Sequence, residues 1–251
     1  MSLWSEVAGI YRSSKKKPDI NWWTEWVARP PAALFVYLVK ETRITPNQIT
    51  FLGLLVAVLS AALFVWLPGY AGAIVAAVIF ELSFVLDCAD GQLARMRKLA
   101  SPLGHQLDFV IDEVKAFVLF GAITLRLYRF AAGDEALTYL IVGVVGMACL
   151  GAGLSMTTFI RLPEYAGAKT KAEKTGAGPA DLGPLAHAVA LLEWAARSVV
   201  HYPSYLLIVA LIPDGRLDIY FWAYAGVNAL YAGRTLLQIM LKLGRFVSQE
   251  R

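Results

Sequence analysis

Cysteine, histidine and charged residues are all scarce in this chain of 251 residues, which has two cysteines, three histidines and 17% charged residues. Cys88 and Cys149 lie inside apolar segments, so they form no disulfide framework and are interpreted as small buried residues. His105, His187 and His201 are isolated, and none has a partner at metal-ligand spacing, which argues against a zinc site. Soluble domains contain about 25% charged residues, so this scarcity argues against an ordinary soluble domain.

Hydrophobic residues, in contrast, are abundant: they make up 58% of the chain, and the mean hydropathy is +0.56. They cluster in long segments, and this pattern is typical of an integral membrane protein. We expect an all-α fold, a bundle of six transmembrane helices. They are expected at about 46–67, 70–95, 105–129, 136–160, 200–213 and 217–241.

The fifth of these spans has two interpretations. Residues 184–199 are helical in pattern but contain Glu193 and Arg197. They form either an interfacial helix that leads into a short span after Pro203, or part of one long kinked helix.

The first 43 residues differ in character from the remainder. Residues 1–17 are polar and basic, and Trp22, Trp23 and Trp26 follow among basic residues. A tryptophan-rich amphipathic piece suits the membrane interface. We therefore expect residues 1–43 to form a cytoplasmic tail and an N-terminal interfacial amphipathic helix, with no signal peptide, and residues 44–251 to form the transmembrane domain.

The placement of basic residues predicts the orientation. Seventeen lysines and arginines lie before the first span, in the loops after the second and fourth spans, or after the last span, whereas three lie on the opposite side: Arg126, Arg129 and Arg216. Cytoplasmic loops carry the excess of Lys and Arg. We therefore expect both termini to face the cytoplasm of a cell whose inner membrane holds the protein. With the basic residues placed in this way, we expect no nucleic-acid partner.

Four aspartates gather at the predicted cytoplasmic ends of the second and third spans. They form the pattern D-x2-D-G-x2-A-R-x8-G-x3-D-x3-D between Asp87 and Asp112, with all eight fixed positions filled. At roughly one in twenty per position, a chance match is on the order of 10⁻¹⁰ per starting point. On helices, Asp87 and Asp90 share one face, and so do Asp108 and Asp112. Carboxylates that converge at a membrane are costly unless neutralised, and they favour hard cations such as Mg²⁺ or Mn²⁺.

This pattern resembles the signature of the CDP-alcohol phosphotransferase family, and the resemblance extends over most of the chain. The segment Pro46-Asn47-Gln48-Ile49-Thr50 also resembles the Pro-Asn-x-Ile-Thr sequence that opens the family's first span. The resemblance implies an enzyme of phospholipid biosynthesis that moves a substituted phosphate group from a CDP-linked donor to an acceptor alcohol and releases CMP. It also implies a homodimer and two bound metal ions, at a site that faces the cytoplasm.

The resemblance implies roles for the motif residues. Asp87, Asp90 and Asp108 are expected to bind metal, and Asp112 is either a shared metal ligand or the catalytic base. The donor-binding residues are expected to be Gly91 and Ala94 at the cytidine, Arg95 at the phosphates, and Asn47 or Thr50 at the nucleotide. For Asn47 and Thr50, a role in starting and packing the helix is the competing interpretation.

Basic residues are the candidates for acceptor binding. Lys115 lies one turn after Asp112 and pairs either with a carboxylate or with an anionic substrate. Arg161, Arg197 and Arg234 match regions that bind the acceptor phosphate in relatives with phosphorylated acceptors. Many relatives have a basic residue directly after the last aspartate, where this chain has Glu113.

The substrates have alternatives. The expected donor is CDP-diacylglycerol, and the alternative is a CDP-polar alcohol such as CDP-inositol, CDP-choline or CDP-ethanolamine, with a lipid or polyol as acceptor. The Ala28-Arg29-Pro30 stretch resembles enzymes that couple CDP-inositol to inositol phosphate. An ion-coupled membrane transporter is the alternative from a different class, and it predicts acids spread over several spans near mid-membrane.

Overall fold

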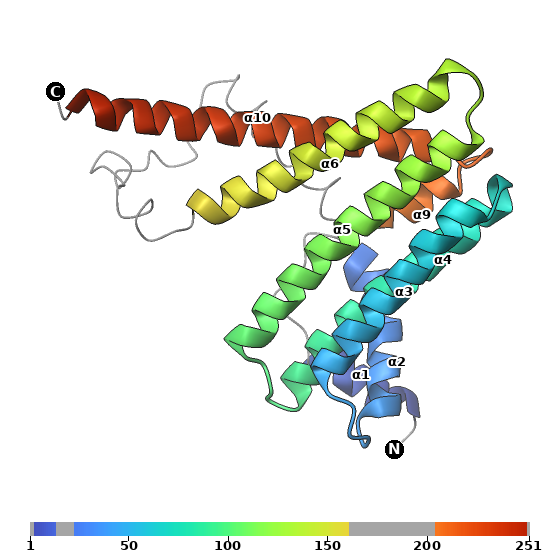
Figure 1. Ribbon diagram of the computed structural model, residues 1–251. Helices are drawn as coiled ribbons and strands as arrows, with labels where there is room; N and C mark the ends of the chain where they lie inside the picture. The colour runs from blue at the N-terminus through green and yellow to red at the C-terminus, as the bar shows by residue number, and fades with distance from the viewer. Residues whose placement is uncertain (1–2, 14–22, 161–203, 250–251) are drawn as a thin grey trace, which may run out of the picture. The chain divides into compact units, whose positions relative to one another are not determined.

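The computed structural model describes residues 3–13, 23–160 and 204–249, and all regular structure within these ranges is helical (Figure 1). The predicted all-α class is therefore confirmed. The chain divides into two compact units, residues 1–136 with 203–217 and residues 137–202 with 218–251. All four aspartates of the motif lie in the first unit.

The helices have the following bounds. The first unit contains α1 (Leu3–Ser13), the short π-helix η1 (Thr24–Ala28), α2 (Arg29–Val39), α3 (Pro46–Trp66), α4 (Gly69–Met96), α5 (Pro102–Phe130) and α9 (Ser204–Ala210). The second unit holds most of α6 (Asp134–Ile160) and of α10 (Leu217–Gln249).

Three of the described helices, α3, α4 and α6, are long and apolar enough to cross a membrane. They match the first, second and fourth predicted spans. Helix α5 has 29 residues, but it carries the charged residues of the motif. The fifth predicted span corresponds in part to α9, whose seven residues extend about 10 Å, against a hydrocarbon core of about 30 Å. The count of six spans therefore stays a prediction.

A capping box starts α3 at the end of the helix that lies near the four aspartates of the motif. Thr45 Oγ1 accepts a hydrogen bond from the Gln48 amide at 3.3 Å, and Gln48 Oε1 accepts one from the Thr45 amide at 2.9 Å. Pro46 at the first helical position needs no amide partner. Such caps contribute about 0.5–2 kcal/mol, and this one fixes where the α3 backbone begins. The helix start predicted at Thr45-Pro46 is confirmed.

A tight turn joins α4 to α5 at the same end of the bundle. Lys98 has a φ of 56°, a left-handed conformation that ends α4. Ser101 then caps α5 by accepting a hydrogen bond from the Gly104 amide at 3.1 Å, and Pro102 occupies the first helical position. Because the turn is short, the start of α5 lies close to the end of α4.

Helix α3 packs against both α4 and α5. Two serines join α3 to α4 inside the apolar interface: Ser60 donates to the Ala76 carbonyl at 2.7 Å, and Ser83 donates to the Gly53 carbonyl at 2.8 Å. A Cβ atom on Gly53 would stand 3.5 Å from the Ser83 carbonyl oxygen, an ordinary van der Waals contact, so the two helix backbones pack closely here. Large apolar side chains on the outer faces of these helices are exposed, as expected for surfaces that contact lipid.

The opposite end of the first unit is closed by Arg126 of α5. Its guanidinium donates to the carbonyls of Phe64 and Leu67 at 3.0 and 2.6 Å and to that of Gly69 at 2.6 Å. These carbonyls belong to the last turn of α3 and the connection to α4. The arginine therefore satisfies backbone acceptors that the helix end leaves unpaired.

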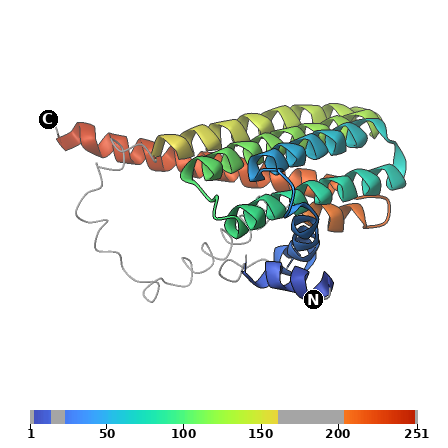
Figure 2. The ribbon, with the colours of Figure 1, turned by 90° about the horizontal axis from the view of Figure 1, so that it is seen from below.

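The N-terminal helices pack against α4 near the end that carries the acids (Figure 2). A buried ion pair joins Arg29 and Glu25, and Tyr11 of α1 donates to Glu25 Oε1 at 2.9 Å. Glu6 and Lys40 form a second pair at 2.5 Å; the hydrogen bond from Lys40 lowers the pKa of Glu6. The predicted interfacial location of this region stays a prediction.

The second unit is held by contacts between α6 and α10. The Tyr139 ring meets Phe221 edge to face, with centroids 5.4 Å apart. Thr157 Oγ1 and Tyr231 Oη lie 3.0 Å apart within hydrogen-bonding distance.

Candidate active site

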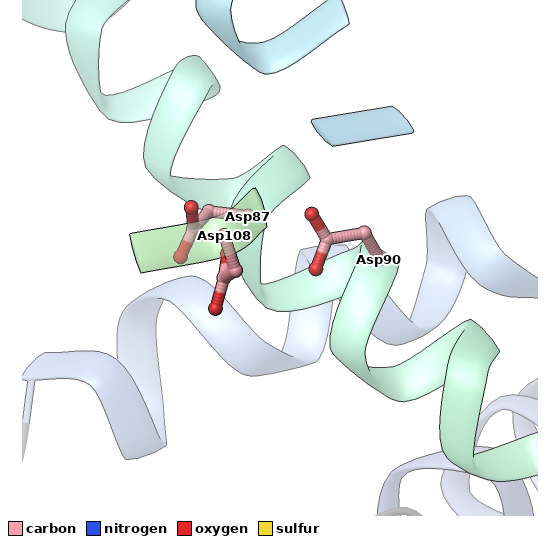
Figure 3. Close-up of side chains that lie close together, drawn as sticks. All are labelled: Asp87, Asp90 and Asp108. Atoms are coloured by element: carbon pink, nitrogen blue, oxygen red, sulfur yellow. The ribbon is translucent and has the colours of Figure 1, made fainter. Parts of the chain in front are cut away.

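Three carboxylates converge in the first unit. Asp87 and Asp90 lie one turn apart on α4, and Asp108 lies on the second turn of α5. Figure 3 shows their carboxylate groups turned toward one shared space, and one oxygen of each lies within 4.8 Å of the others. The sequence spacing thus brings these residues together as expected, and the short connection between α4 and α5, residues 97–101, places the two helices side by side.

Thr50 of α3 fixes the most enclosed of the three. Asp90 is 6% exposed, and its Oδ2 accepts a hydrogen bond from the Thr50 hydroxyl at 2.5 Å. The two interpretations of Thr50, nucleotide contact or packing, therefore gain a third: Thr50 orients a carboxylate of the cluster. A charge-assisted hydrogen bond of this kind contributes about 1.5–3 kcal/mol.

Asp112 interacts with Asp87, but it is not one of the three residues whose carboxylate oxygens all converge. Its side chain is 52% exposed, and its Oδ1 accepts a hydrogen bond from Lys115 at 3.1 Å. Lys115 also donates to Asp87 Oδ1 at 2.6 Å. Of the two interpretations of Lys115, the geometry favours the pairing with carboxylates, and the group of converging ligands contains Asp87, Asp90 and Asp108 without Asp112.

A cavity of about 450 Å³ opens beside the cluster, between the start of α3, the end of α4 and the turn into α5. Asp90 and Asp108 form part of its wall. The five predicted donor-binding residues all line it: Asn47, Thr50, Gly91, Ala94 and Arg95. Sequence positions up to 48 residues apart therefore meet at one pocket next to the acids.

Small residues shape this cavity. A Cβ atom on Gly91 would come within 3.1 Å of Arg95 Nη1, so a larger residue would push against the guanidinium. A Cβ atom on Gly104 would lie 3.3 Å from Ser101 Oγ and would crowd the cap of α5. The two motif glycines therefore leave room for the arginine and for the turn, which gives their presence in the pattern a physical reason.

Two residues near the site were not predicted. His105 lines the cavity, although its sequence spacing indicated no metal partner and no role was predicted for it. Arg97, counted only for orientation, donates to the carbonyls of Val39, Lys40, Thr42 and Ile44 at distances of 2.5–3.0 Å. It holds the segment that leads into α3. Its position two residues after Arg95 of the motif was the only available signal, and spacing alone does not reveal tertiary carbonyl partners.

The described structure does not test the three predicted acceptor-binding arginines. Arg161 and Arg197 lie outside the described residues. Arg234 is an exposed residue of α10 in the second unit. Their roles remain predictions.

The donor set of the cluster fits a hard divalent cation. Three carboxylates supply only oxygen ligands, which suit Mg²⁺ or Mn²⁺ rather than zinc. Asp90, Asp108 and Arg95 all line the cavity. A cation held by the aspartates and the Arg95 guanidinium would therefore both present positive charge to an anionic ligand in the cavity.

The chain was compared with known proteins. The sequence model of the family described as CDP-alcohol phosphatidyltransferase matches residues 43–213. The archaetidylinositol phosphate synthase of Pyrococcus horikoshii is 34% identical over 109 residues, which are 43% of this chain and 52% of that protein.

Two proteins called bifunctional IPC transferase and DIPP synthase are also similar. The one from Aquifex aeolicus is 31% identical over 91 residues, 36% of this chain and 20% of that protein. The one from Thermococcus kodakarensis is 36% identical over 72 residues, 28% of this chain and 15% of that protein. The chain thus spans about half or less of the length of the curated relatives it matches.

Proposed function

Because the chain belongs to the CDP-alcohol phosphatidyltransferase family, and is therefore a transferase of substituted phosphate groups, we propose that it transfers a phosphatidyl-type group from a CDP-linked lipid to a phosphorylated polyol and releases CMP. The observation that carries this proposal is the group of three converging carboxylates beside a cavity of about 450 Å³, which Arg95 also lines.

The cavity suits the nucleotide end of the donor. Gly91 and Ala94 offer a flat wall for the cytosine, and Arg95 offers a fixed cation with directed donors for the phosphates. Asp87, Asp90 and Asp108 would hold Mg²⁺ or Mn²⁺, two ions in our proposal. When bound, the metal supplies positive charge that neutralises the diphosphate.

The reaction is a displacement at phosphorus. The acceptor hydroxyl attacks the phosphorus that carries the alcohol group of the donor, and the bond from that phosphorus to the bridging oxygen of the diphosphate breaks. The electron pair leaves with CMP. Asp112 takes the proton of the acceptor hydroxyl, a role that suits its half-exposed side chain beside the enclosed cluster.

The choice of acceptor rests on the relatives. One relative is called an archaetidylinositol phosphate synthase, and this name contains an inositol phosphate. We propose an acceptor of the same chemical class, a polyol that carries a phosphate, with arginines from the later helices as its binding residues. The alternative is a CDP-polar alcohol as donor. The transporter alternative is not favoured, because the acids gather at adjacent ends of two helices rather than along several spans.

We further propose that the protein is a homodimer in the cell membrane with the cavity open to the cytoplasm. The cavity lies at the end of the bundle that the basic residues assign to the cytoplasmic side.

A panel assay tests the proposal. The purified protein in lipid vesicles with Mg²⁺ would be given CDP-diacylglycerol, a CDP-linked ether lipid, CDP-inositol or CDP-choline, each with inositol phosphate, inositol, glycerol phosphate or serine, and CMP would be measured. Release of CMP only with a CDP-lipid and a phosphorylated polyol is the expected result. Release of CMP only with unphosphorylated alcohols would refute the proposed acceptor class. If none of the four donors yields CMP, the proposed reaction is refuted.

A further inference from the structure

Arg29 is a buried cation in the N-terminal helices, outside residues 43–213 that match the family model. It is 7% exposed, and arginine is rarely buried to this extent unless it is paired. Its partner is Glu25, four residues earlier, which is also 7% exposed and accepts a hydrogen bond from the Tyr11 hydroxyl at 2.9 Å. A pair of opposite charges is therefore enclosed between helices that precede the family domain.

Gln92 of α4 connects this pair to the motif. It is 1% exposed, and its Nε2 donates to the Arg29 carbonyl at 3.1 Å. Its Oε1 has no hydrogen-bond partner within the described helices, and a buried amide oxygen without a partner is costly. An apolar residue of similar size would avoid that cost, so the bond to Arg29 is the contact that accounts for a glutamine at this position.

Arg95 lies one turn after Gln92 and borders the cavity. A Cβ atom on Gly91 would come within 3.1 Å of Arg95 Nη1, so the guanidinium extends back along α4 beside that glycine. The charge of Arg29 also acts on Arg95, and the two cations repel each other. Because Arg95 lines the cavity and Arg29 does not, this repulsion favours positions of the Arg95 guanidinium toward the cavity.

From these contacts we infer that Arg29, held by Glu25 and Gln92, is a positioning residue that directs Arg95 toward the phosphates of the donor. A segment before the family domain would thereby tune the affinity for the nucleotide. The inference rests on the proposed function for the role of Arg95. Its central requirement is that the charge of Arg29, and not only its packing, matters.

Calorimetric titration of the full-length protein in detergent with CMP and Mg²⁺ tests this requirement. Arg29→Met leaves the Glu25 carboxylate buried without its cation, so Arg95 is attracted away from the cavity, and we expect CMP to bind about tenfold more weakly. Glu25→Gln leaves the Arg29 charge in place, so CMP should bind at least as tightly as to the wild type. The double variant carries neither charge, and its affinity should return to within about threefold of the wild type.

Transfer assays on the same variants separate binding from chemistry. The KM for the donor should follow the order of the CMP affinities, while kcat and the KM for the acceptor stay near the wild-type values. Arg29→Lys retains the charge and should restore the donor KM. Arg12→Gln is the control, because it removes an exposed charge of α1 whose guanidinium donates to the Ala8 carbonyl of the same helix. It should change none of these quantities.

The reaction of Arg95 with phenylglyoxal probes the same contact without metal or nucleotide. The reagent attacks the uncharged guanidine, which a neighbouring cation favours and a neighbouring carboxylate disfavours. The rate, followed by mass spectrometry of the peptide that contains Arg95, should be highest in Glu25→Gln and lowest in Arg29→Met. The wild type and the double variant should lie between them.

If Arg29 only packs, the double variant should bind CMP at least as poorly as Arg29→Met, and that result would overturn the inference. If Arg29→Met does not fold in thermal melts, Glu25→Gln and the double variant decide, because equal CMP affinities and equal phenylglyoxal rates would show that the Arg29 charge does not act on Arg95. If instead the wild type binds no CMP and releases none from any CDP-linked donor, the proposed function fails. The order of the phenylglyoxal rates then still tests the action of Arg29 on Arg95.

Discussion

Asp90 shows how single residues prepare the cluster. Its carboxylate is buried, and its position is set by a hydroxyl from α3 rather than by its own helix. Buried charges need hydrogen bonds or ion pairs, and Thr50 for Asp90 and Lys115 for Asp87 provide them. The carboxylates are thereby oriented for the cation that we propose they bind.

The hydrogen bond from Thr50 is testable by a matched pair of variants. Thr50→Val removes the hydroxyl and keeps the shape, so Asp90 loses about 1.5–3 kcal/mol of charge-assisted hydrogen bonding. We expect the Mg²⁺ concentration for half-maximal CMP release to rise about tenfold or more, whereas Thr50→Ser should resemble the wild type. Equal metal requirements in Thr50→Val and the wild type would show that Thr50 only packs.

Asp112 is expected to act in proton transfer. Asp112→Asn has nearly the same shape but accepts no proton at neutral pH, so transfer should fall by about 10²–10⁴-fold. Binding of the CDP-linked donor, measured by calorimetry with Mg²⁺ present, should change little because Asp112 lies outside the converging ligands. Loss of donor binding in this variant would place Asp112 among the metal ligands instead.

At the scale of elements, the start of α3 forms one wall of the cavity beside the acids, and the arginine that caps the C-terminal end of α4 holds the loop before α3. Arg97 donates hydrogen bonds to four carbonyls of residues 39–44, at the end of α2 and in the loop that leads to Thr45. Carbonyls at a helix end have no partner within the helix, so the guanidinium satisfies them and fixes the loop.

Loss of this clamp should affect both stability and donor binding. We expect Arg97→Met to lower the free energy of unfolding by about 1–3 kcal/mol and to raise the KM for the donor more than that for the acceptor. Arg43→Met, in the same exposed loop, serves as the matched control. Thermal melts and donor titrations check both effects, and identical behaviour of the two variants would remove the role given to Arg97.

The sequence predicted the elements best where local chemistry determines them. Thr45-Pro46 begins a helix as predicted, because a side-chain cap and a proline act within one turn of chain, whereas α5 begins at Pro102, before the expected start at about residue 105. The carboxylate spacing predicted the cluster for the same reason. The partners of Thr50, Arg97 and Lys115 were missed or left open because they depend on how α3, α4 and α5 pack, which no local pattern encodes.

At the scale of the whole molecule, the first unit is polarised along its helices. The acids and the cavity lie where α4 ends and α5 begins, and Arg126 closes the connection between α3 and α4 near the far end of α5. Helix α5 has 29 residues and is therefore about 43 Å long, enough to separate its two ends by the thickness of a bilayer.

Cysteine labelling tests the predicted orientation. Arg43→Cys lies in the exposed loop before α3, and Ala132→Cys lies in the exposed turn after α5. In intact cells, a membrane-impermeant thiol reagent should label Ala132→Cys, and it should label Arg43→Cys only after permeabilisation, because basic loops remain in the cytoplasm. Cys88 and Cys149 would be replaced by alanine in both variants. The reverse pattern would place the cavity on the outer side.

Metal-dependent release of CMP, compared between the wild type and Asp108→Asn, tests the central claim most directly. Of the three converging carboxylates, Asp108 alone comes from α5. Its replacement should therefore remove the contribution of α5 to the proposed metal site and leave the two aspartates of α4 in place. With a CDP-linked lipid and inositol phosphate, the wild type should release CMP when Mg²⁺ or Mn²⁺ is added and none after chelation, and folded Asp108→Asn should remain at background at every metal concentration. Wild-type release of CMP by Asp108→Asn, or by the wild type in excess chelator, would contradict the account.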